Sequence, residues 1–482
     1  MSQRDNQLRQ EAYAEIEKFR DQVEADPHRL RFHIQPPVGL LNDPNGFIQY
    51  NGTYHMFYQW MPFKTGHGAK FWGHYTSSDL VNWQAEPIAL TPSEWFEKNG
   101  CYSGSAIEAN GKMNLFYTGN VKDEEGNRES YQVLATSEDG IHFEKQGVVL
   151  ELPEDYTAHF RDPKVWKHED TWYMVVGTQN HDLQGRVALF RSTDLEAWEH
   201  MGIVTGAHTD QLDDFGFMWE CPDLFELQGK HILVVSPQGL EADGNHYQNV
   251  YQSGYFVGDM NYNTGKLNHG SFKELDQGFE FYAPQTTVDE HGRRILVGWM
   301  GVPDQDEEHH PTIKHKWIHT LTLPRELILE GDKLIQKPVQ ELEKLRKEEV
   351  SYERVELNDV ETTIEGIEGD AFELHVGFES NDSDVFELTL RNDARLVYHK
   401  PSGELTLERK RFEDRRTESR TCKIGNLEDL HLFVDTSSIE MFVNGGEEVF
   451  TARYYPSENN RTVQFAASGE VTLNISHWKL SE

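Results

Sequence analysis

Three acidic positions in this sequence share surroundings that suit acid–base chemistry. Asp43, Asp162 and the pair Glu220-Cys221 are each followed by proline. Each also stands eight or nine residues before a turn that opens a short apolar strand. One acidic residue before proline is usually a solvated charge in a turn. Three in the same register predict a shared site.

The strands that must position these acids recur as a repeat. Five units of similar sequence, each a turn followed by a short apolar strand, start 59, 59, 59 and 63 residues apart. They begin at Gly52, Gly111, Asp170, Gly229 and Gly292. Units of about 60 residues with several short strands are typical of a five-bladed β-propeller, whereas a β-sandwich array would show this spacing only by accident.

The propeller geometry brings the acids together, because the first strand of every blade lines the central channel. Like charges held close raise the pKa of at least one carboxyl group, so that one acid can donate a proton beside another that stays ionised. Glycosidases divide the work between two carboxyl groups in this way. Phe217, Met218 and Trp219 precede Glu220. This apolar flank favours Glu220 as the proton donor.

The rest of the chain divides around the propeller. Leu8, Ala12, Ile16, Phe19 and Val23 form one stripe of an amphipathic helix. The predicted all-β architecture has a short N-terminal helix within 1–30, a propeller over 31–337, a linker over 338–350 and a β-sandwich over 351–482. The sandwich follows from renewed apolar alternation in the last segment.

Composition limits the possible partners and compartments. Forty-five basic residues stand against 82 acidic ones, a net charge of -37, which excludes binding to nucleic acid or to an anionic membrane surface over most of the molecule. Three widely spaced cysteines predict no disulfide framework. The N-terminal residues lack the apolar segment of a secretory signal, so a cytoplasmic location is expected, as a monomer or homodimer.

The residues around the acids resemble a known family. The three motifs are Leu41-Asn42-Asp43-Pro44-Asn45-Gly46, Phe160-Arg161-Asp162-Pro163 and Trp219-Glu220-Cys221-Pro222-Asp223. Three further short segments support the resemblance: Phe57-Tyr58-Gln59, Phe71-Trp72-Gly73-His74 and Tyr102-Ser103-Gly104-Ser105. In order and spacing they resemble the signature motifs of glycoside hydrolase family 32, the β-fructofuranosidases.

The resemblance implies a role for each acid and a set of sugar-binding residues. Asp43 would be the nucleophile, Glu220 the general acid/base and Asp162 the stabiliser that accepts hydrogen bonds from fructosyl hydroxyls. The expected substrate-binding residues are Leu40, Leu41, Asn42, Gln59, His67, Trp72, Tyr102, Ser103 and Arg161. Trp299 is expected to line the pocket or to lie in the core. The reaction would proceed by two displacements with net retention and without a metal or organic cofactor.

The expected substrate is a small sugar. Leu40-Leu41 resembles the bacterial branch of the family that acts on sucrose 6-phosphate. No acidic residue occurs between Pro44 and Ser78, where Lys64, His67 and Lys70 could form a cationic rim for a phosphate, although inner strands also exclude acids. The alternatives are an invertase or exo-fructosidase acting on unphosphorylated sucrose and short fructans, and a non-catalytic sugar-binding propeller.

Overall fold

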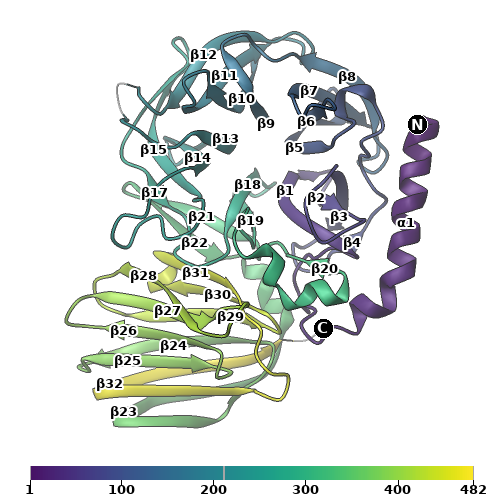
Figure 1. Cartoon of the computed structure of the whole chain (residues 1–482). Coiled ribbons are helices and arrows are strands. Elements are labelled where there is room, and N and C mark those ends of the chain that lie inside the picture. Colours follow the sequence, from purple (N-terminus) through teal and green to yellow (C-terminus); the bar gives the residue numbers. More distant parts are fainter. Residues whose placement is uncertain (1, 210–211, 481–482) are drawn as a thin grey trace.

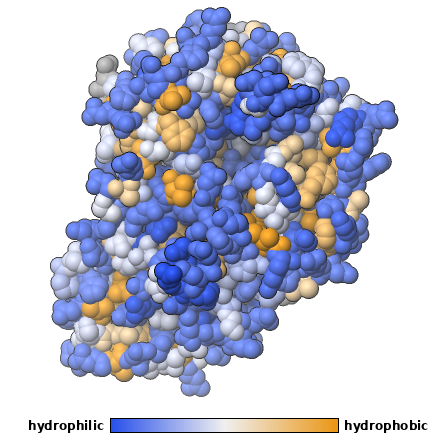
Figure 2. Space-filling model, in the orientation of Figure 1, coloured by the Kyte–Doolittle hydropathy of each residue, from blue (hydrophilic) through white to orange (hydrophobic). Residues whose placement is uncertain are grey.

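One long helix, a ring of five β-sheets and a C-terminal β-rich domain make up the computed structural model, which describes residues 2–209 and 212–480 (Figure 1). The predicted fold class is confirmed: a five-bladed propeller precedes a sandwich-like domain. The face shown in Figure 2 is largely hydrophilic, with small separate apolar patches. Among the described residues, no helix combines the length and apolar character that crossing a membrane requires.

The N-terminal helix α1 (Gln3–Glu24) lies beside the first blade (Figure 1). Ser2 caps it, since its hydroxyl accepts a hydrogen bond from the Asp5 amide at 3.2 Å. Leu8, Ala12 and Val23 of the predicted stripe are buried, and the other two members pack beside them. The stripe therefore attaches the helix to the body of the protein.

The five blades follow one another along the chain, each with its first strand innermost. The first comprises β1 (Gly39–Tyr50), β2 (Thr53–Met61), β3 (Phe71–Ser77) and β4 (Gln84–Ala85), and the second, after the 3-10 helix η1 (Trp95–Glu97), comprises β5 (Cys101–Ala109), β6 (Lys112–Lys122), β7 (Arg128–Ser137) and β8 (Glu144–Leu150). The third comprises β9 (Tyr156–His168), β10 (Thr171–Asn180), β11 (Gly185–Ser192) and β12 (Glu199–Gly206). The fourth comprises β13 (Met218–Leu227), β14 (Lys230–Gln238), β15 (Gly254–Asn261), β16 (Lys266–His269) and β17 (Lys273–Glu274), and the fifth β18 (Tyr282–Val288), β19 (Arg294–Trp299), β21 (Arg325–Glu330) and β22 (Lys333–Pro338).

The repeated turns of the sequence join the first and second strands of the blades. At Asn51-Gly52 both residues have positive φ, 50° and 77°, and Asn110-Gly111 repeats the pattern with 55° and 71°. Two successive positive φ angles make the tight hairpin turn whose twist matches that of paired strands. The regular spacing of the units is therefore the spacing of these hairpins.

The ring is closed by a segment that connects β19 and β21, the second and third strands of the fifth blade. The chain leaves β19, forms η2 (Glu307–His309) and η3 (Pro311–His315), and then adds β20 (Trp317–Ile318) to the first blade. β20 pairs in parallel with β1, with Gly39 opposite Trp317. Backbone pairing of β20 with β1 thus connects the segment that leaves the fifth blade to the first blade.

The C-terminal domain folds one continuous set of strands around its own apolar core. The 3-10 helix η4 (Gln340–Leu345) leads into it, and its first strand begins at Arg346, inside the segment expected to be a linker. Its elements are β23 (Arg346–Glu368), β24 (Phe372–Asn381), β25 (Val385–Leu390), β26 (Ala394–His399), β27 (Glu404–Lys410), β28 (Thr417–Lys423), β29 (Asp429–Asp435), β30 (Ser438–Val443), η5 (Asn444–Gly446), β31 (Glu448–Arg453) and β32 (Thr462–Leu480).

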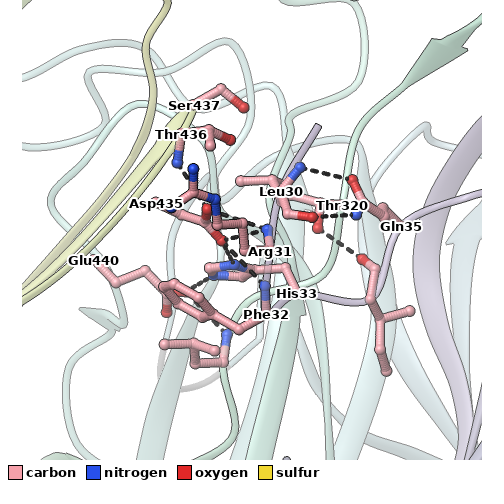
Figure 3. A network of polar contacts seen from close by, with 12 residues as sticks. Leu30, Arg31, Phe32, His33, Gln35, Thr320, Asp435, Thr436, Ser437 and Glu440 are labelled. Carbon is pink, nitrogen blue, oxygen red and sulfur yellow. Dashed lines mark hydrogen bonds and ion pairs between the residues drawn. The ribbon is translucent and has the colours of Figure 1, made fainter. Parts of the chain in front are cut away.

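A buried histidine joins the two domains (Figure 3). His33 precedes the first blade and contacts Asp435 through Nδ1 and Glu440 through Nε2, both at 2.9 Å. Arg325 of the fifth blade donates to the other Glu440 oxygen at 2.8 Å. Burial alone would lower the pKa of His33, but the hydrogen bonds and charges of both carboxylates raise it to about 9.

We expect His33→Gln to destabilise the protein in a pH-dependent way. The folded pKa exceeds the unfolded value of 6.5, so the stabilisation by His33 is complete below pH 6.5 and is lost as the pH rises through about 9. The substitution should lower the free energy of unfolding by about 3 kcal/mol in the acidic range, with a smaller loss near pH 10. Urea unfolding at both pH values measures this.

The matched control is His142→Gln, because His142 pairs with Asp139 at 2.7 Å on the exposed surface. Such a pair contributes little, so the control should unfold like the wild type at both pH values. A loss of equal size at both pH values for the His33 variant would contradict the assignment of a charged histidine.

Candidate active site

All five innermost strands break register with the second strand of their blade at the same level. The residues in these β-bulges are Asn42-Asp43, Tyr102-Ser103, Asp162-Pro163, Cys221-Pro222 and Ala283-Pro284. A bulge bends its strand and re-aims a side chain. Five bulges at one level explain how side chains from every blade reach a common pocket.

Three of these bulges place a residue other than glycine in the left-handed region. Asp162 has φ 68°, and Cys221 and Ala283 both have φ 48°. Such a conformation costs on the order of 1 kcal/mol or more for each residue and persists only where the surrounding structure imposes it. The strain falls at equivalent places in three blades, where it serves to position side chains rather than to stabilise the sheets.

The pocket at the bulges has a volume of about 510 Å³, within the range of small-molecule sites. Asp43, Asp162 and Glu220 all line it, so the structure brings together the three acids that the sequence placed in register. Seven of the expected sugar-binding residues line it with them: Asn42, Gln59, His67, Tyr102, Ser103, Arg161 and Trp299.

Asp43 is held by donors on both of its oxygens. Ser103 donates to Oδ2 at 2.6 Å and Asn42 donates to Oδ1 at 3.1 Å. Burial raises the pKa of Asp43, the Ser103 hydrogen bond opposes this, and the charge of Glu220 raises the pKa further. The two donors fix the orientation of the carboxylate and favour its ionised form.

Asp162 accepts a hydrogen bond from the Cys221 amide at 3.0 Å. Burial and the nearby charge of Glu220 raise the pKa of Asp162 to about 7, although Arg161 opposes the shift. The Cys221 thiol lies 3.5 Å from Asp162 and 3.6 Å from Asp43, so a single sulfur atom bridges the two carboxylates. Burial raises the pKa of this thiol well above its usual value, which keeps it protonated.

Glu220 lies among polar groups rather than in the apolar environment expected from its sequence neighbours. Arg161 donates to Oε1 through Nε at 2.9 Å and through Nη2 at 2.6 Å. Tyr282 and Gln238 donate to Oε2 at 2.6 and 3.1 Å.

The expectation of an apolar environment for Glu220 was wrong because its side-chain carboxylate contacts Arg161, Gln238 and Tyr282 rather than its sequence neighbours. Met218 and Trp219 are fully buried, Trp219 within an apolar cluster of the third and fourth blades, and Phe217 is 41% exposed. The residues that surround Glu220 come from other strands and other blades.

Three expected substrate-binding residues lie outside the pocket. Leu40 and Leu41 are fully buried in apolar clusters, and Trp72 is fully buried between the first two blades. The Trp72 indole donates to the Tyr102 carbonyl at 3.0 Å, so this residue supports the bulge of the second blade instead of contacting a ligand.

Several pocket residues escaped the sequence analysis, but Tyr282 had a detectable signal. Ala283-Pro284 stands nine residues before Gly292, which repeats the register of the acids in the fifth unit. Tyr282 is therefore the register equivalent of Arg161 and of Glu220. Gln238, Asn120, Lys122 and Arg128 lie on second and third strands, for which the repeat carries no comparable mark.

Comparison with known proteins agrees with this architecture. The model of the "Glycosyl hydrolases family 32 N-terminal domain" matches residues 33–338, and that of the "Glycosyl hydrolases family 32 C terminal" matches residues 341–480. A sucrose-6-phosphate hydrolase of Bacillus subtilis is 55% identical over 480 residues, which covers 100% of both chains.

Two solved structures share the whole fold. The sucrose-6-phosphate hydrolase of Lactobacillus gasseri is 32% identical with a TM-score of 0.87, over 97% of this chain and 96% of that one. A β-fructofuranosidase of Bombyx mori is 33% identical with a TM-score of 0.86, over 99% of each chain. The matched motifs surround the pocket, and both domain models cover the chain in order. The chain belongs to glycosyl hydrolase family 32.

Proposed function

We propose that this enzyme hydrolyses the β-D-fructofuranosyl bond of sucrose 6-phosphate and of sucrose by a retaining double displacement. The convergence of three carboxylates on one pocket is the observation that supports it most directly. The full-length similarity to a sucrose-6-phosphate hydrolase supports the substrate class. A structure of the silkworm relative as a mutant in complex with sucrose supports a sugar ligand for this fold.

In the first step Asp43 attacks C2 of the fructosyl unit while Glu220 donates a proton to the bridging oxygen. The C2–oxygen bond to the leaving sugar breaks, and a fructosyl ester forms on Asp43. Ser103 and Asn42 hold the attacking carboxylate in place through their hydrogen bonds. Because the nucleophile is oriented before substrate arrives, little reorganisation is needed during the attack.

In the second step Glu220 takes a proton from water, which attacks C2 and releases fructose and the free carboxylate of Asp43. Arg161 then stabilises the ionised form that Glu220 has at the start of this step. Asp162 accepts hydrogen bonds from fructosyl hydroxyls. These hydrogen bonds offset the free-energy cost of burying its carboxylate. The same three acids thus serve binding, proton transfer and covalent chemistry.

We also propose that the enzyme works in the cytoplasm. Cys101, Cys221 and Cys422 are all free thiols, which suits a reducing compartment. A phosphorylated disaccharide is available where sugars are phosphorylated during uptake, which is inside the cell.

Kinetic analysis of Asp43→Asn and Glu220→Gln separates the two proposed roles. Asp43→Asn should lower kcat roughly ten-thousand-fold on every substrate, because no ester can form. Glu220→Gln should lower kcat on sucrose about a hundred-fold or more. On p-nitrophenyl β-D-fructofuranoside, whose leaving group needs no acid, it should retain a rapid first turnover that stopped-flow absorbance detects as a burst.

Glu226→Gln is the matched control, since Glu226 is an exposed residue of the same strand as Glu220. It should behave as the wild type on both substrates. Equal losses for the Glu220 variant on both substrates, with no burst, would argue against a proton-donating role.

Asp162→Asn should stabilise the protein while impairing catalysis. The pKa of Asp162 is raised from 3.8 to about 7, so its carboxyl group loses stabilising free energy as the pH rises through that interval, and the full cost is present above pH 7. The variant should therefore melt a few degrees above the wild type near pH 8, and at about the same temperature near pH 4. Calorimetry at both pH values tests this.

The control here is Asp182→Asn, an exposed aspartate of the third blade. Its melting temperature should follow that of the wild type at both pH values. A destabilised Asp162 variant near pH 8 would mean that hydrogen bonding outweighs charge burial at this position.

A further inference from the structure

Two basic side chains of the second blade face the pocket without an acidic partner. Lys122 and Arg128 are opposite each other in the β6–β7 hairpin, and both line the pocket that contains Glu220. In the part of the chain that the structure describes, neither side chain forms an ion pair with a carboxylate.

The other cations of the pocket are already engaged. Arg161 is bound to Glu220, as described above. Lys70 donates to Asn42 at 2.7 Å and lies 2.8 Å from His67, which in turn contacts Glu307. The cationic rim expected from the acid-free segment is thus committed to protein partners at two of its three residues.

The third member of that rim, Lys64, does not line the pocket. Of the basic residues in the pocket wall, Lys122 and Arg128 are the ones whose charges remain available to a ligand. The sequence argument for a phosphate therefore points to different residues once the structure is known.

Acids at the tip of the same hairpin do not neutralise the pair. The Asp123 carboxylate accepts hydrogen bonds from the Asn127 amide and side chain, each at 2.7 Å. Glu124 and Glu125 are exposed at the tip and lie outside the pocket wall. The hydrogen bonds of Asp123 are thus made within the turn, whereas Lys122 and Arg128 line the pocket.

Arg128 lies beside Tyr102, another residue of the pocket wall. Its guanidinium lies 6.0 Å from the ring centre of Tyr102, the residue that precedes the Asp43 donor Ser103. Burial and the charge of Arg161 lower the pKa of Arg128, while Tyr102 and Glu220 oppose this. A partly desolvated guanidinium beside another cation becomes more favourable when an anion binds.

A neighbouring amide also lacks a partner. Asn120, two residues before Lys122 on β6, is 1% exposed and lines the same pocket. Its Oδ1 has no hydrogen-bond partner among residues 2–209 and 212–480. A buried acceptor of this kind is normally satisfied, and a sugar hydroxyl in the pocket would satisfy it.

We propose that Lys122 and Arg128 form the binding site for the phosphate of the leaving sugar and set the preference for sucrose 6-phosphate over sucrose. This inference rests on the proposed function. Arg128 offers the planar fork that binds two phosphate oxygens, and Lys122 offers a point charge beside it. The competing account is that both cations merely balance the three carboxylates of the pocket.

The test compares kcat/KM for sucrose 6-phosphate and for sucrose in Lys122→Gln, Arg128→Gln and the double variant. Each single substitution should lower the ratio of the two values about tenfold, and the double substitution about a hundred-fold, because a charge-assisted hydrogen bond is lost each time. The loss on sucrose should stay within about threefold. Lys112→Gln is the matched control, since Lys112 lies on the same strand and pairs with exposed Glu138 at 3.2 Å.

Binding of glucose 6-phosphate, followed by titration calorimetry, gives a readout that does not depend on hydrolysis. The wild type should bind it and the double variant should bind it at least tenfold more weakly. An unchanged ratio, or equal losses on both sugars, would overturn the inference in favour of simple charge balance. Hydrolysis of neither sugar by the wild type would instead refute the proposed function, whereas hydrolysis of sucrose without preference would refute this inference alone.

Discussion

The mutual repulsion of three carboxylates in one pocket sets the conditions that the surrounding structure must meet. Asp43, Asp162 and Glu220 come from three different blades, so the ring must hold strands that would otherwise move apart. The parallel pairing of β20 with β1 closes that ring by hydrogen bonds. Donors then divide the charge: Ser103 binds one acid and Arg161 another. The closed ring keeps the three carboxylates close together, and the hydrogen-bond donors stabilise their charges, so that the acids can take part in catalysis.

The β-bulges are the means by which a repetitive sheet makes a specific site. Without them, equivalent positions of the five inner strands would present the same geometry to the axis. Each bulge lets its blade contribute a different group, and three of them hold a residue at positive φ. The strain and the buried charge both lower stability, which is a common cost of catalytic sites.

Much of this arrangement was predictable because it depends on regular features of the backbone that leave a repeating pattern in the sequence. The hairpin turns recur at fixed spacing, and the acids keep a fixed distance from them, so the ring and the common pocket followed from the sequence. The surroundings of each side chain were not predictable in this way. The contacts of Glu220 come from other blades, and Trp72 packs against residues of the second blade, so neither environment follows from the adjacent sequence. Which cations stay unpaired depends likewise on contacts across blades, as Lys122 shows.

The most direct test of this account is to identify the residue that carries the fructosyl group during turnover. Rapid acid quenching of Glu220→Gln with p-nitrophenyl β-D-fructofuranoside, followed by peptide mass spectrometry, would locate the ester. The account predicts one added fructosyl unit on the peptide that contains Asp43. An adduct on Asp162, or a single turnover that leaves no adduct on the protein, would contradict the central claim that the bulge of the first blade presents the nucleophile.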